Sequence, residues 1–253
     1  LSSDQYHNTL RDLFGGSLGA LMVGASTYPE TKVSEGLATD AAANTVNESE
    51  SRQIEDNASA MSALALNHID DILSCGSTPL SDQDIDQCID SFINDFGRRA
   101  YRRPLTDAET SIVRGLYDLG RVDEAASGFR SVVEFFLQSP ALLYHVEYGH
   151  RPGEQGSHVV ELSGYEMATR LAYFLTNSAP DLQLLSAAAQ GQLLTSEGLQ
   201  EQARRLMNGE GFFDSLESFH RDLFHTYRLK DFSFDENIIN IDDFMKVDLR
   251  VAK

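Results

Sequence analysis

The stretch FGRRAYRRPLTDAE, residues 96–109, decides how this chain of 253 residues folds. It contains the end of one helix, a proline and the start of another helix. Pro104 cannot continue a helix, because it lacks an N–H group and its ring clashes with the preceding turn. Thr106 and Glu109 have the spacing of a capping box, in which the threonine oxygen accepts from the amide three residues on. The stretch therefore predicts a sharp junction between two helices.

Four arginines surround this junction: Arg98, Arg99, Arg102 and Arg103. At the end of a helix, positive charge complements the helix dipole and can satisfy free carbonyl groups. The 39 Asp and Glu residues of the chain also offer many internal partners. The alternative is an anion-binding pocket, because a guanidinium group binds a carboxylate through two parallel hydrogen bonds. We favour the structural role and keep the anion pocket as the second interpretation.

Helical periodicity dominates the rest of the chain, and alternating strand patterns are almost absent. The expected helices start near residues 2, 48, 81, 106, 123, 142, 163, 180, 195 and 211. Residues 15–47 are rich in Gly, Ser, Thr, Ala and Asn with weak periodicity, which predicts a long irregular segment. The predicted fold class is all-α, a multi-helix antiparallel array of about nine or ten helices with one long irregular N-terminal segment.

The domain organisation follows from the same junction. We expect an N-terminal helical region over residues 1–104 and a C-terminal one over 105–253, or a single compact unit. Residues 246–253 resemble the interior of a helix, so the second region is expected to continue further. No run of about 18 apolar residues occurs, so we expect no transmembrane segment.

The net charge of −19 and the isoelectric point near 4.6 restrict the kinds of partner. Nucleic-acid binding requires a basic surface, and so does attraction to an anionic membrane. Both are therefore disfavoured. The acidic balance favours solubility, cationic partners or high-salt surroundings.

Cys75 and Cys88 flank a short loop between two predicted helices. A bridge between them would stabilise the fold by about 3 kcal/mol in the chain-entropy model. Two free thiols in a reducing compartment are the alternative. The spacing alone leaves both open.

No motif for a nucleotide, a nucleophilic serine or a zinc protease occurs, and no Cys-x-x-Cys-His motif attaches a c-type haem. The weak metal candidates are His145, Glu147 and His150, but on a helix the first two point about 200° apart. His220 and His225 are five residues apart, where a helical metal pair needs three or four. We therefore expect no metal site and no cofactor, and no catalytic constellation is found.

Four stretches carry a resemblance to known proteins: LSSDQYHNTLRDLFG (1–15), FINDFGRRAYRRPLTDAE (92–109), FLQSPALLYHVEYG (136–149) and LSGYEMATRLAYFLTNSAPD (162–181). In this order they resemble a family of secreted helical domains of unknown function. The family is known from planctomycete-type and myxobacterial-type proteins, often alongside c-type cytochrome domains. Two departures are the absence of Trp and the presence of His145 where the family often has Arg.

The resemblance implies an exported (periplasmic, cell-surface or secreted) helical module with a Cys75–Cys88 bridge and with further domains after residue 253. It implies no catalytic mechanism. We expect a non-catalytic scaffold or partner subunit of a larger assembly that includes other protein subunits and a c-type cytochrome. One alternative is an enzyme domain that acts on a surface polymer or an anionic small molecule. Another is a carbohydrate-binding module, for which Tyr28, Tyr148 and Tyr227 are the aromatic candidates.

Overall fold

The computed structural model describes residues 1–32, 44–73, 75, 76, 78–149 and 160–224. Helices hold 73% of these residues, and no strand occurs among them, so the all-α prediction is confirmed. The elements are α1 (Ser3–Phe14), α2 (Gly16–Ala25), α3 (Glu48–Asn67), α4 (Ile69–Ile72), α5 (Asp82–Ala100), α6 (Asp107–Gly120), α7 (Ala125–Gln138), α8 (Pro140–Leu143), α9 (Gly164–Thr176), α10 (Leu182–Ala189), a 3-10 turn η1 (Gln192–Leu194), α11 (Ser196–Met207) and α12 (Glu210–Leu223).

Local sequence defines where the helices begin. The two predicted capping boxes form at Thr106, which starts α6, and at Ser163, which starts α9. In each box the cap hydroxyl accepts from the amide of a glutamate whose carboxylate accepts from the cap backbone. Three further helices, α1, α3 and α5, begin with the same device. These caps satisfy amides that a helix cannot satisfy itself.

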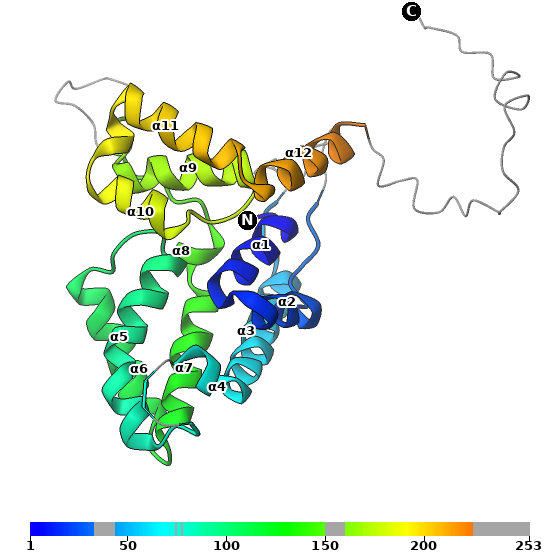
Figure 1. The fold of residues 1–253 in the computed structure, drawn as a ribbon. Coiled ribbons are helices and arrows are strands. Elements are labelled where there is room, and N and C mark those ends of the chain that lie inside the picture. The colour runs from blue at the N-terminus through cyan, green and yellow to red at the C-terminus, as the bar shows by residue number, and fades with distance from the viewer. Residues whose placement is uncertain (33–43, 74, 77, 150–159, 225–253) are drawn as a thin grey trace, which may run out of the picture.

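The larger hydrophobic cluster lies within α1–α8, where α7 packs against α3, α5 and α6 (Figure 1). Its centre is aromatic. Phe92 of α5 lies 5.0 Å, between ring centroids, from both Phe96 and Phe129, and Phe96 lies 5.7 Å from Phe136. Aromatic rings at such separations add to the free energy of burial, so α5 and α7 form the rigid base of the fold.

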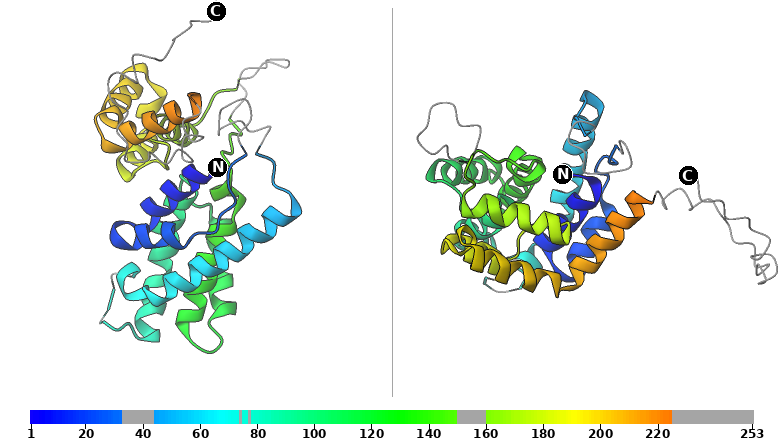
Figure 2. Two further views of the ribbon diagram at one scale, coloured as in Figure 1. Left: turned by 90° about the vertical axis from the view of Figure 1, so that its right-hand side faces the viewer. Right: turned by 90° about the horizontal axis from the view of Figure 1, so that it is seen from above.

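A smaller cluster is formed by α9, α10, η1 and α11, and α12 packs against α9 and α11. Its core is built of small and aliphatic side chains such as Ala168, Ala172 and Leu184. The two clusters form separate layers, with the smaller one above the larger (Figures 1 and 2). This grouping does not test the division expected at residue 104, which stays a prediction.

Three sequence expectations about elements are corrected. Residues 16–25 of the expected irregular segment form α2. That helix is apolar on all sides, so it carries no helical periodicity to detect. The expected helix from Glu48 to about Ser74 stops at Asn67, and His68 separates it from the short α4. The expected helix over 142–148 is only α8, because Tyr144 is already extended and residues 145–149 form no helix.

Cys75 and Cys88 are joined by a disulfide, as the resemblance implied. The bond ties the loop before α5 to the first turns of that helix. In the described part of the chain, no helix is both long and apolar enough to cross a membrane.

We predict that replacing both cysteines, Cys75→Ser with Cys88→Ser, lowers the free energy of unfolding by about 3 kcal/mol, because a 13-residue loop is no longer closed in the unfolded chain. Urea unfolding followed by circular dichroism measures the change. Wild-type protein with its disulfide reduced serves as the control and should match the variant. Equal midpoints for oxidised wild type and variant would contradict the prediction.

Candidate functional site

Arg102 lies where the chain turns between α5 and α6, and it is only 4% exposed. Its backbone is in the left-handed region, with φ of 59°. For a residue with a Cβ atom, this conformation is less favourable by about 1–2 kcal/mol than the right-handed one. The turn sends the side chain away from α6 toward the end of α8, so contacts there must offset the strain.

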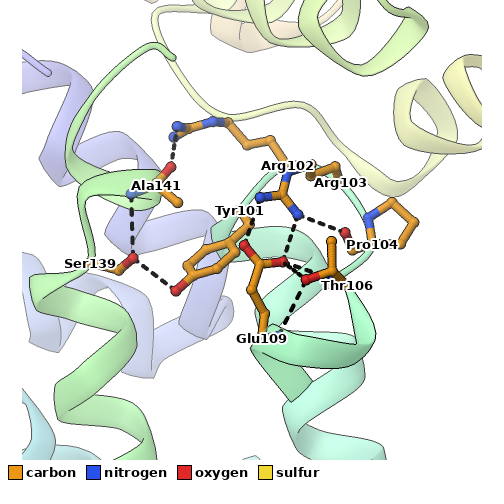
Figure 3. Close-up of polar contacts among 8 residues, drawn as sticks. All are labelled: Tyr101, Arg102, Arg103, Pro104, Thr106, Glu109, Ser139 and Ala141. Atoms are coloured by element: carbon orange, nitrogen blue, oxygen red, sulfur yellow. Dashed lines mark hydrogen bonds and ion pairs between the residues drawn. The ribbon is translucent and has the colours of Figure 1, made fainter. Parts of the chain in front are cut away.

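The guanidinium of Arg102 caps the last carbonyl groups of α8. Nη2 donates to the carbonyl oxygen of Ala141 at 2.5 Å (Figure 3). It also donates to the carbonyl oxygen of Tyr144 at 2.7 Å. Nη1 donates to the carbonyl of Leu142 at 3.0 Å. The final carbonyls of a helix have no partner inside it, and a charged donor makes the stronger kind of hydrogen bond. One arginine thus satisfies three backbone acceptors.

Tyr173 of α9 completes this arrangement. Its hydroxyl accepts a hydrogen bond from Arg102 Nη1 at 3.3 Å, and it is hydrogen-bonded to Thr9 Oγ1 of α1 at 2.7 Å. The guanidinium carbon of Arg102 lies 5.6 Å from the centre of the Tyr173 ring, a cation–π contact. Tyr173 is buried but lies in neither hydrophobic cluster. We call Arg102, Tyr173 and Thr9 the polar junction.

Further polar contacts cross between the same two layers. Asn8 donates to the carbonyl of Asn177, and Ser178 donates to the carboxylate of Asp12. Burial raises the pKa of Asp12, and the Ser178 hydrogen bond partly opposes that shift. Hydrogen bonds therefore carry much of the contact between the layers.

Arg103 turns the other way and binds Glu109 of α6. Two parallel hydrogen bonds of 2.8 Å join its guanidinium to both carboxylate oxygens (Figure 3). These bonds, with those from Thr106, lower the pKa of Glu109 to about 2. The same carboxylate completes the capping box of α6, so this ion pair fixes the start of the helix.

Arg99 donates to the carbonyl of Leu13 at 2.6 Å and lies 3.6 Å from Asp95. Arg98 is half-buried, and its Nε has no hydrogen-bond partner among the described residues. The guanidinium groups of three of the four arginines are therefore bonded to other groups of the same chain. This arrangement supports the structural interpretation of the arginine block over the anion pocket.

A groove of about 590 Å³ opens beside the polar junction, between the start of α1, residues 145–147, α9 and α12. Its apolar lining includes Phe174, Phe212, Leu216 and Phe219. Sequence reasoning missed the groove, because four segments far apart in the chain form it. The one available signal was Phe174, an aromatic residue on the outer side of α9.

The weak metal candidates engage different partners. Glu147 forms an ion pair with Arg170 at 2.6 Å. The His145 ring lies 4.2 Å from the Tyr173 ring, and desolvation with the charge of Arg102 lowers its pKa to about 3. His150 lies outside the described residues. Within those residues, no group of three His, Cys, Asp or Glu side chains could hold a metal ion.

The other histidine and aromatic candidates are also scattered. His220 is hydrogen-bonded to the carbonyl of Leu216, and His225 lies outside the described residues. Tyr28 stacks on Tyr6 at 3.9 Å, which covers one of its faces. Tyr148 is exposed, and Tyr227 is also outside the described part.

Two segments of the chain match known protein families. Residues 88–147 match PSD5, a protein of unknown function (DUF1595), and residues 162–251 match PSD4, a protein of unknown function (DUF1592). No curated protein and no solved structure matches the chain. Both matched families are of unknown function, and neither match links the chain to a kind of organism or to a cytochrome. Arg102 lies in the first matched segment and Tyr173 in the second.

We predict that Arg102→Ala lowers the free energy of unfolding by about 2–4 kcal/mol, because three buried carbonyls lose a charged donor. Arg102→Gly should be less harmful by about 1 kcal/mol, because glycine adopts positive φ without strain. Urea midpoints measure both. Arg98→Ala is the control and should change stability by at most about 1 kcal/mol. Equal losses for all three variants would contradict the assignment.

The Arg103–Glu109 pair predicts a pH dependence. Because the pKa of Glu109 is lowered by folding, its stabilisation is complete above pH 4.5 and is lost as the pH falls toward about 2. The loss should be about 1–2 kcal/mol after screening by solvent. Stability curves of wild type and Glu109→Gln between pH 2 and 6 test this, with Glu147→Gln as a control on a more exposed pair. Parallel curves for wild type and Glu109→Gln would refute it.

Proposed function

We propose that this chain is a non-catalytic helical module of an exported protein and that it holds a partner subunit in a larger assembly. The observation that carries the proposal is a second apolar stripe on α6. The inner side of this helix already buries Val113 and Tyr117. Its outer side carries Ile112, Leu116 and Leu119, one or two turns apart, and Val122 follows the helix.

Three of these side chains face solvent, Ile112 at 57%, Leu119 at 74% and Val122 at 83% exposed, and Leu116 is half-buried. Single exposed apolar residues are ordinary, but a row of them at helical spacing is typical of a face that binds another helix. The occupant we propose is an amphipathic helix of a partner subunit. With a net charge of −19, the chain favours a partner whose surface is cationic.

The disulfide supports export, because such bonds persist in oxidising compartments. A c-type cytochrome remains part of the proposal as one class of partner, on the family resemblance alone. The enzyme alternative has less support, because three of the four arginines that were to bind a substrate anion are bonded to the chain itself.

The test uses complexes isolated from the native envelope fraction. Wild-type protein should sediment as part of a larger complex, and the double variant Leu119→Asp with Val122→Asp should sediment as a free monomer. Each charge placed in an apolar interface costs several kcal/mol. Leu194→Asp is the matched control, since Leu194 is 63% exposed on η1, and it should leave the complex intact. A wild-type protein that sediments alone, or a double variant that keeps the complex, would overturn the proposal.

A further inference from the structure

The last described helix, α12, is amphipathic, yet none of its residues is buried. Five apolar side chains along it are 41–66% exposed: Phe213, Leu216, Phe219, Leu223 and Phe224. Two of them, Leu216 and Phe219, line the groove at the polar junction together with Phe212 and Phe174. So many exposed large apolar side chains on one helix are unusual on a protein with nothing packed against it.

α12 cannot simply rotate to bury this face. It is tied to α1 at the groove, because Arg221 forms an ion pair with Asp4 and Ser218 donates to the same carboxylate. Its packing against α9 and α11 also fixes it. Whatever covers the apolar face must therefore come from outside the described residues.

We infer that residues 225–251 of the same chain cover the apolar face of α12 and fill the groove. The described chain ends on this face, at Phe224, and 29 residues follow. The family match over residues 162–251 includes α9–α12 and continues through that segment. The apolar face of α12 and residues 225–251 therefore belong to the same matched segment.

The composition of the segment suits this role. It contains six acidic and four basic residues, a net charge of −2. It is also rich in large apolar residues: Tyr227, Leu229, Phe232, Phe234, Ile238, Ile239, Ile241, Phe244, Met245, Val247, Leu249 and Val251. Large apolar side chains are what a segment needs to cover an apolar surface.

Chain length and tethering favour this occupant over a second copy or a separate protein. A helix of 14 residues is about 21 Å long, and extended chain spans about 3.3 Å per residue. Fewer than half of the 29 residues after Phe224, in an extended conformation, are therefore enough to run back along the whole length of α12. A short tether also gives an effective concentration in the millimolar range, which a free partner rarely reaches.

The test places a photoreactive benzoylphenylalanine at position 219 of the full chain. Irradiation should cross-link it to residues 232–251 within the monomer, mapped by mass spectrometry. Cross-links to residues 225–231 are not counted, because these residues directly follow Phe224 and are close to position 219 whether or not the segment covers α12. The same group at position 112 on α6 is the control and should give at least about tenfold fewer of these cross-links, because a segment that is bound along α12 is not free to contact α6. Cross-linked dimers, cross-links to another protein or no cross-links at all would overturn the inference.

A second measurement does not depend on the cross-linker. Trypsin should cleave after Lys246 and Arg250 at least about tenfold faster in Phe219→Asp than in wild type, because the covering segment is released. Ile112→Asp should leave that rate unchanged. Equal rates for wild type and Phe219→Asp would overturn the inference. The α6 face is not involved, so this result is independent of the proposed partner binding.

Discussion

The buried guanidinium of Arg102 holds the two hydrophobic clusters of this chain together. It joins the end of α5 to the end of α8 and reaches the hydroxyl of Tyr173 in the second layer. Lysine could not replace it, because three carbonyls and one hydroxyl around a plane require the fixed fork of a guanidinium group. Arg102 adopts the unfavourable left-handed backbone conformation, and this conformation directs its guanidinium group toward α8.

This arrangement explains how a polar contact joins two apolar clusters. Buried polar groups are costly unless they are paired, and Arg102 supplies the donor for three carbonyl groups near the end of α8. The interface between the layers is therefore directional: Tyr173 must lie where both Arg102 and Thr9 reach it. Such an interface defines one orientation of the layers, and that orientation creates the groove beside α12.

Much of the fold could be predicted from sequence, because caps and apolar periodicity are local. The proline and capping box after Arg103 placed the α5–α6 junction, and Ser163 placed the start of α9. α2 could not be predicted, because a helix that is apolar on all sides has no periodic signal. The site was only partly predictable. Its arginines were recognisable, but Arg102 binds backbone carbonyls and a tyrosine, and no sequence pattern specifies partners 39 to 71 residues away.

Hydrogen exchange during urea unfolding tests the central role of Arg102 most directly. Amides of α7 report on the larger cluster, and amides of α9 report on the smaller one. In wild type, both sets should become exchangeable at the same urea concentration, because the polar junction couples the clusters. In Arg102→Ala, the α9 amides should open at a clearly lower urea concentration than the α7 amides. If α7 and α9 still open together in Arg102→Ala, or already open separately in wild type, Arg102 does not couple the two clusters.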